Sequence, residues 1–346
     1  MKEMYVKKKT TYIATGSAVL ALLLSACGGG SGDKLEDVDY SLNGATAQPS
    51  ASFATPFAAS GTEARIVEEG TGDEIVDGDT ILVDATVFNG ADGSSVGTTY
   101  ADAPMVIPVT DQLKEAAPEL YEILAGAKVG TTFSYTTNID QASTSTAEAT
   151  PTVSPGTATN VEVYTVTSKL LKSAEGVENE KKSSALEEFS VGDDGAPTLK
   201  LAEDRGDAPT ELYTEDLITG EGAVLGENDT VYANYVGVTW SDGAVFDENF
   251  STQPLSFSLN GVIEGWKEGL KGKTVGSRVL LQIPSELAYG EDAADSGAPE
   301  GALVFVVDIL GSSQARTAEA TSSAPAESSD NPESTQSPEA TASASE

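Results

Sequence analysis

Histidine is absent from this 346-residue chain, and cysteine occurs only once, at position 27. Without histidine, no Ser-His-Asp or Cys-His catalytic arrangement can form, and no imidazole is present to bind zinc. With a single cysteine, the chain can form no internal disulfide. Most hydrolase and zinc-dependent functions are therefore excluded.

Positive charge is also scarce, because 19 Lys and Arg residues face 55 Asp and Glu residues, giving a formal net charge of −36. A surface this acidic repels nucleic acid and anionic lipid headgroups, so we expect no nucleic-acid partner. No loop has the D-x-D-x-D-G spacing of a specific calcium site. The sequence thus predicts neither a metal site nor a cofactor.

Long apolar runs are missing as well, and the run from Ile13 to Leu24 is too short to span a bilayer. It follows a lysine-rich start, which makes residues 1–26 a predicted secretion signal. The run ends in Leu24-Ser25-Ala26-Cys27, which resembles a bacterial lipoprotein box. We expect Cys27 to carry lipid, rather than to be a free structural cysteine, and to hold the protein on the extracytoplasmic face of the cell membrane.

Composition divides the remaining chain into two candidate domains with connecting segments. Residues 27–60 are rich in Gly, Ser, Ala and Thr and predict a flexible tether, whereas the charged residues 173–207 predict an exposed linker. Residues 313–346 are acidic and rich in Ser, Thr and Pro, which predicts a disordered tail. The two candidate domains are residues 61–172 and 208–312.

These two segments repeat a common pattern of turn residues. Asp79-Thr80 corresponds to Asp229-Thr230 at an offset of 150, and Val129-Gly130 corresponds to Val275-Gly276 at an offset of 146. We expect Tyr164 to take the place of Phe305. Each repeat reads mostly as strands, with one short amphipathic helix. The predicted fold class is therefore α+β, with an antiparallel sheet curled around a short helix in each domain.

The second repeat carries five motifs in a characteristic order. They are VYANYVG (231–237), VFD (245–247), GVIEGWKEGL (261–270), LAYG (287–290) and ALVFVVDIL (302–310). Their order and spacing resemble the FKBP-type peptidyl-prolyl cis-trans isomerases, the macrolide-binding immunophilins. The resemblance covers residues 210–312 and implies the same antiparallel sheet around a helix.

The resemblance also implies roles for individual residues. Trp266 would form the floor under a substrate proline, and the walls would be Tyr235, Phe246 and Phe305. The backbone N–H of Ile263 and the hydroxyl of Tyr289 would bond to substrate carbonyls, and Asp247 would orient the pocket. Val262 and Leu255 would contact the substrate, although Leu255 stands where the family usually has an aromatic residue. The loop 290–301 is acidic where many relatives carry bulky apolar residues.

Such an apolar site suits one reaction in particular. Rotation about an X–Pro bond needs no nucleophile or base, and an apolar pocket favours the less polar twisted amide over the planar ground state. The expected substrates are proline-containing polypeptides, with a macrolide as a further expected ligand. We expect an isomerase that assists the folding of exported proteins at the cell envelope.

The first repeat is expected to lack this activity, because Ala85, Val96 and Gly97 align with Tyr235, Phe246 and Asp247, and Leu120 aligns with Trp266. Two other functions stay open at this point. One is a non-catalytic peptide-binding or chaperone lipoprotein that uses the same groove. The other is a solute-binding lipoprotein of a transporter, which would need alternating strands and helices in two lobes.

Overall fold

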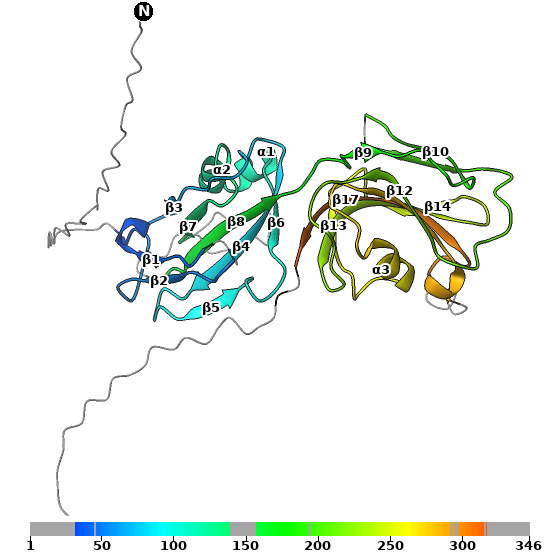
Figure 1. The fold of residues 1–346 in the computed structure, drawn as a ribbon. Coiled ribbons are helices and arrows are strands. Elements are labelled where there is room, and N and C mark those ends of the chain that lie inside the picture. Colours follow the sequence, from blue (N-terminus) through cyan, green and yellow to red (C-terminus); the bar gives the residue numbers. More distant parts are fainter. Residues whose placement is uncertain are drawn as a thin grey trace, which may run out of the picture. The chain divides into compact units, whose positions relative to one another are not determined.

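The described part of the chain is built mainly from antiparallel strands with few helices, as the sequence predicts (Figure 1). A computed structural model provides the coordinates. It describes residues 32–44, 46–138, 157–193, 195–290, 293, 297–314 and 316. The predicted secretion signal, Cys27 and nearly all of the predicted acidic tail lie outside the described residues.

The first large sheet has six strands in the order β3-β7-β8-β4-β5, with β6 also paired to β4. Short helices α1 and α2 lie over one of its faces. The bounds are β3 Glu63–Glu68, β4 Thr80–Phe88, β5 Ser95–Thr98, β6 Met105–Pro108, α1 Asp111–Ala116, α2 Pro118–Leu124, β7 Thr132–Thr136 and β8 Val161–Lys169.

The second large sheet has seven strands in the order β14-β13-β17-β16-β12-β9, with β15 also paired to β13. Its inner face curls around helix α3 (Figure 1). The bounds are β9 Val177–Glu178, β12 Tyr213–Thr219, β13 Thr230–Thr239, β14 Val245–Glu248, β15 Leu255–Ser258, α3 Glu264–Leu270, β16 Arg278–Ile283, the 3-10 turn η3 Ser285–Leu287 and β17 Leu303–Ser313.

Six strands of the two sheets follow one connection order. In the first sheet, β4 pairs with β5, β6 and β8, and β8 pairs with β7. In the second sheet, with β9 left aside, β13 pairs in the same way with β14, β15 and β17, and β17 pairs with β16. The pairing register gives the residue correspondence. Ala85 lies opposite Tyr164, whereas Tyr235 lies opposite Val307. Val87 lies opposite Glu162, whereas Gly237 lies opposite Phe305. The residue at the position of Phe305 is therefore Glu162, and the expectation that Tyr164 occupies it is wrong.

The segment 173–207 is not an exposed linker. It contains the hairpin β10 Leu186–Val191 and β11 Pro197–Leu201, which packs on the outer face of the second sheet. Leu186 and Leu199 are buried there against strands β13 and β17. Strand β13 is consequently covered on both faces, by α3 on one and by this hairpin at Val236 and Val238 on the other, and apart from Asn234 its central residues are apolar or aromatic on both sides.

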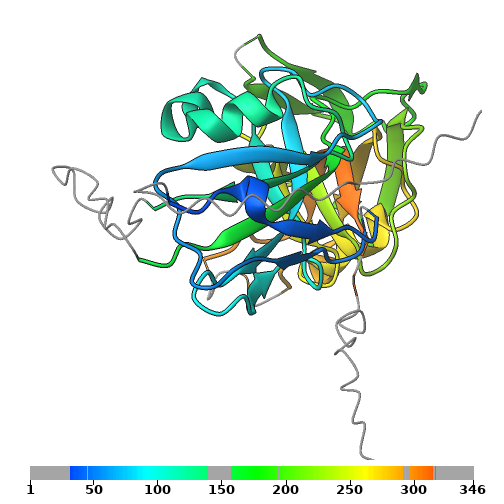
Figure 2. The same cartoon turned by 90° about the vertical axis from the view of Figure 1, so that its left-hand side faces the viewer.

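The predicted tether 27–60 is likewise folded from residue 32 onward. The 3-10 turn η1 Leu35–Asp37 and the hairpin β1 Asp39–Ser41 with β2 Ser50–Ser52 lie on the outer face of the first sheet. Leu35 and Phe57 are buried in this layer. Hairpin and helices lie on opposite faces of the first sheet (Figures 1 and 2). Each large sheet thus begins with a hairpin that covers its outer face.

Within the described residues, no helix combines the length and apolar character needed to cross a membrane. Nor do those residues include a group of three or more His, Cys, Asp or Glu side chains placed to hold a metal ion.

Candidate functional site

A cavity of about 250 Å³ lies between α3 and the inner face of the second sheet. It is lined by Tyr235, Phe246, Asp247, Phe257, Gly261, Val262, Ile263, Trp266, Tyr289 and Phe305. The structure thus brings together, around one space, eight of the nine pocket residues that the sequence predicts. Their motifs are separated by up to 70 residues along the chain.

Helix α3 delivers Trp266 to this cavity because two glycines let the helix approach strand β16 closely. A Cβ on Gly265 would lie 2.4 Å from the Ile283 side chain, and one on Gly269 would lie 2.6 Å from Leu281. The helix begins at Glu264 rather than at residue 261. Val262 and Ile263 therefore line the cavity from the segment that enters the helix.

The aromatic rings meet edge to face around Trp266. Its ring centroid lies 5.2 Å from that of Tyr235, 5.3 Å from that of Phe257 and 5.3 Å from that of Phe305. Phe246 meets Phe305 at 5.5 Å with an interplanar angle of 90°. Such contacts fix ring orientations as well as burying area. The indole Nε1 of Trp266 is buried and has no hydrogen-bond partner among the described residues.

Two tyrosines and one carboxylate supply the polarity of the cavity. The hydroxyl of Tyr235 donates to Oδ2 of Asp247. Burial, together with this hydrogen bond and the charge of Asp247, raises the pKa of Tyr235 above its ordinary value. Burial and the same carboxylate raise the pKa of Tyr289, which lies at the rim with 42% of its surface exposed. Both phenols therefore stay protonated and able to donate at neutral pH.

Leu255 lies outside the residues that line the cavity, since it is 43% exposed on β15. The aromatic wall from this strand is Phe257, which contacts both Trp266 and Tyr235. The sequence prediction missed Phe257, although it lies two residues beyond Leu255 on the same strand and so points to the same face.

Gly237 is a second contributor that the sequence prediction missed. A Cβ at this position would lie 2.6 Å from Phe246 and 2.7 Å from Phe305. A side chain would therefore separate the two rings. Its signal in the sequence is an isolated glycine inside a strand, which is typical of a close approach by neighbouring groups.

The first sheet offers no such aromatic enclosure at the corresponding positions. Ala85, Val87 and Gly97 stand where the second sheet has Tyr235, Gly237 and Asp247. The carboxyl group of Glu162, at the position of Phe305, accepts a hydrogen bond from Tyr164. Burial raises the pKa of Glu162. The aromatic walls of the second-sheet cavity, Tyr235, Phe246, Phe257, Trp266 and Phe305, form an aromatic box. In the first sheet a carboxyl group stands at the position of one of these walls.

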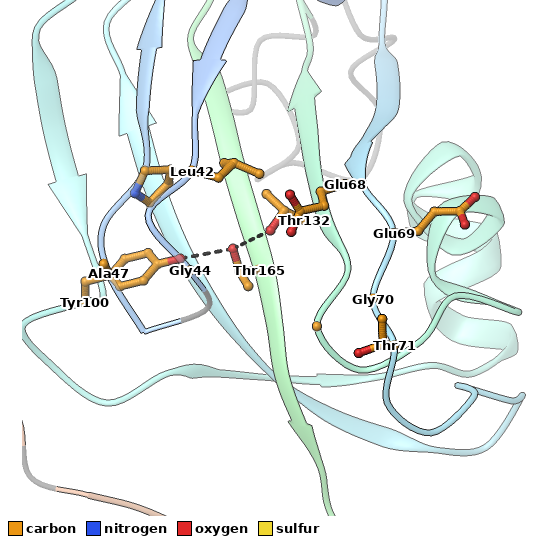
Figure 3. Close-up of a pocket in the computed structure, with 12 residues that line it drawn as sticks. Leu42, Gly44, Ala47, Glu68, Glu69, Gly70, Thr71, Tyr100, Thr132 and Thr165 are labelled. Carbon is orange, nitrogen blue, oxygen red and sulfur yellow. Dashed lines mark hydrogen bonds between the residues drawn. The ribbon is translucent and has the colours of Figure 1, made fainter. Parts of the chain in front are cut away.

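A different cavity, of about 220 Å³, lies beside the β1–β2 hairpin on the other face of the first sheet (Figure 3). The Tyr100 hydroxyl donates to Thr165 at 3.0 Å, and the Thr165 and Thr132 hydroxyls bond to each other at 3.0 Å (Figure 3). Glu68 and Glu69 also line it. Its lining mixes hydroxyls and carboxylates with a few apolar side chains, and Tyr100 is its one aromatic residue among those described.

Comparison with known proteins agrees with this geometry. The sequence model described as FKBP-type peptidyl-prolyl cis-trans isomerase matches residues 222–310, a range that contains the whole lining of the aromatic cavity. A probable FK506-binding protein of Corynebacterium glutamicum is 41% identical over 106 residues, which are 30% of this chain and 90% of that protein. The chain belongs to the FKBP-type peptidyl-prolyl cis-trans isomerase family.

Two further similarities concern only part of the other protein. The isomerase FkpA of Escherichia coli (strain K12) is 40% identical over 128 residues, covering 36% of this chain and 47% of FkpA. The crystal structure of FkpA from Escherichia coli aligns with a TM-score of 0.29 at 40% identity, covering 32% of this chain and 52% of that one. The chain therefore spans about half the length of FkpA.

Proposed function

We propose that this chain catalyses cis/trans isomerisation of X–Pro bonds in polypeptides, and that the cavity of the second sheet is its active site. The observation that carries the proposal is the aromatic cavity around Trp266, whose polar groups include the paired Tyr235 and Asp247 and the rim hydroxyl of Tyr289. Among the described residues that line it, there is no Ser, Thr or Cys nucleophile and no His or Lys base. Bond rotation is chemistry that needs neither.

The mechanism follows from the polarity of the amide. The barrier to rotation, about 18–20 kcal/mol, arises from amide resonance, which is lost when the bond twists. Moving the bond from water to an apolar enclosure disfavours the more polar planar form relative to the twisted one. Trp266 would support the proline ring from below, with Tyr235, Phe246, Phe257 and Phe305 as walls.

Polar contacts would hold the flanking peptide while the bond rotates. The N–H of Ile263 and the hydroxyl of Tyr289 are the proposed donors to substrate carbonyls. Asp247 would keep the Tyr235 ring in place by accepting the hydrogen bond from its hydroxyl. Holding the substrate near the twisted geometry contributes to rate in the same way as other positioning effects.

We further propose that the protein is a lipoprotein of the cell envelope with two repeats of one fold, of which only the second is an isomerase. The shared strand order supports the repeat, and the missing aromatic box supports inactivity of the first. The sequence around Cys27 supports the anchor. Assistance to exported proteins would follow, because uncatalysed isomerisation takes tens to hundreds of seconds. Macrolide binding belongs to the same proposal.

A peptide-binding lipoprotein without catalysis is the second candidate, because the same cavity could hold a proline without lowering the barrier. A protease-coupled or NMR exchange assay on the full chain separates the two. We expect Phe246→Ala to lower kcat/KM about 10-fold or more. Val96→Ala, the matching change in the first sheet, should leave kcat/KM unchanged.

The same assay tests the mechanism through its pH profile. Because the pKa values of Tyr235 and Tyr289 are raised, both phenols stay protonated across pH 6–9, about the range where a general base would titrate, so the rate should be nearly flat there. A wild-type chain that binds proline peptides but leaves their exchange rate unchanged would establish the binding function instead. A steep profile in this interval would reject the mechanism.

A further inference from the structure

Strand β13 loses its edge partner beside the active site. One edge of β13 pairs with two strands in turn. Residues 230–233 pair with β15, ending with Ala233 opposite Leu255, and residues 236–238 pair with β14, beginning with Val236 opposite Glu248. Tyr235 lies between these two paired segments. Its backbone N–H and C=O point toward the gap where β14 has ended and β15 has not begun.

Asn249 closes this gap almost alone. Its side-chain Oδ1 accepts the N–H of Tyr235 at 2.7 Å, and its own backbone N–H donates to the C=O of Tyr235 at 3.1 Å. Its Nδ2 donates to the C=O of Ala233 at 3.0 Å and to the C=O of Gln253 at 3.2 Å. The residue is 2% exposed. One buried residue thus replaces the missing strand pairing, through its backbone N–H and its side chain, and its side chain ties the following loop to β13.

We propose that Asn249 is a positioning residue for the isomerase site, an inference that rests on the function proposed above. Asn249 and Asp247 hold the same tyrosine at its two ends, since one fixes the backbone of Tyr235 and the other accepts its hydroxyl. The ring between these two points contacts Trp266 and Phe305. Movement of the Tyr235 backbone would therefore displace a wall of the cavity.

The first sheet provides an internal comparison. Thr99 occupies the matching position, where its hydroxyl accepts the N–H of Ala85 at 2.9 Å and its N–H donates to the C=O of Ala85 at 3.0 Å. The backbone closure is thus kept where the aromatic box is missing. What only Asn249 adds is the amide nitrogen that bonds to Ala233 and Gln253. Asn249→Thr therefore separates the closure of the strand edge from the tie to the loop.

The test compares Asn249→Thr and Asn249→Ala in the full chain by proline isomerisation, with the melting temperature measured in parallel. We expect Asn249→Ala to lower kcat/KM about 10- to 100-fold and Asn249→Thr to lower it less. Val238→Ala, a buried change on the opposite face of β13, controls for lost stability alone. It should lower the melting temperature without a matching loss of rate.

A double-mutant cycle with Tyr235→Ala, which removes the ring that Asn249 is proposed to position, gives a readout that a purely structural role would not move. If Asn249 acts through Tyr235, the combined loss in kcat/KM should be clearly smaller than the product of the separate losses. Independent losses, or full activity of both Asn249 variants, would overturn the inference. Should Asn249→Ala fail to fold, Asn249→Thr carries the cycle. An inactive wild-type chain would instead reject the proposed function.

Discussion

At the scale of single residues, Trp266 organises the cavity, because the rings of Tyr235 and Phe305 both meet its indole edge to face. Trp266, Tyr235 and Phe305 are large and lie in apolar segments, so the sequence predicts that they pack in one core, and in the structure they belong to the same core cluster. Phe257 was missed because a neighbouring apolar residue on the same strand face satisfies the same pattern. Glu162 could not be placed from the sequence, because the offset between the repeats changes again before β8, and only the pairing register reveals it.

Glu162 leads to a pH-dependent prediction. Burial raises its pKa, so the fold favours the neutral carboxyl group, and this contribution to stability is complete below the ordinary value of 4.5 and is lost as the pH rises through the raised pKa. Glu162→Gln, which stays neutral, should therefore melt at a higher temperature than the wild type at pH 7. The difference should close near pH 4. Glu122→Gln, an exposed change on α2, serves as the control. An equal effect at both pH values would contradict this account.

At the scale of elements, strands and the central helix follow from the sequence, whereas the two covering hairpins do not. Apart from Asn234, the central side chains of β13 are apolar or aromatic on both faces, which predicts burial. Strand β10 has three apolar residues among charged ones and looks like a solvated segment. Its burial depends on the outer face of a sheet that is distant in sequence. The apolar residues on both faces of β13 were nonetheless a sign that a second layer exists.

The β10–β11 hairpin should therefore contribute to the stability of the second sheet. Leu199 is 7% exposed against that sheet, so Leu199→Ala should lower the free energy of unfolding by about 2–4 kcal/mol. Both tryptophans of the chain, Trp240 and Trp266, belong to the second sheet and its helix, so fluorescence during urea unfolding reports on this part. Val191→Ala, at a 40% exposed position of the same hairpin, should change the free energy by less than about 0.5 kcal/mol. If both variants changed the free energy of unfolding by a negligible amount, the hairpin would not contribute to the stability of the second sheet.

At the scale of the whole molecule, composition predicts what the protein avoids and where it works. The net charge of −36 disfavours polyanionic partners, and the sequence around Cys27 favours a lipid anchor. Neither property depends on the fold. The number of folded layers, by contrast, depends on contacts between segments that are distant in sequence. From composition alone, the segments that contain the β1–β2 and β10–β11 hairpins were therefore predicted to be a tether and a linker.

The anchor has a direct test in cell fractionation. Cys27→Ser removes the thiol that would carry lipid, so the protein should appear in the soluble fraction or remain as an uncleaved precursor. Ser31→Ala, a change beyond the box, should leave both processing and membrane association as in the wild type. Membrane-bound and normally processed Cys27→Ser protein would rule out lipidation at this residue.

The early start of folding at residue 32 has a consequence for how such an anchor would work. Cys27 precedes the first described residue, Gly32, by five positions, and five fully extended residues span at most about 18 Å. Under the proposed lipidation, covalent geometry alone would therefore keep the β1–β2 layer close to the lipid headgroups, in place of the long flexible tether that the composition of residues 27–60 predicts.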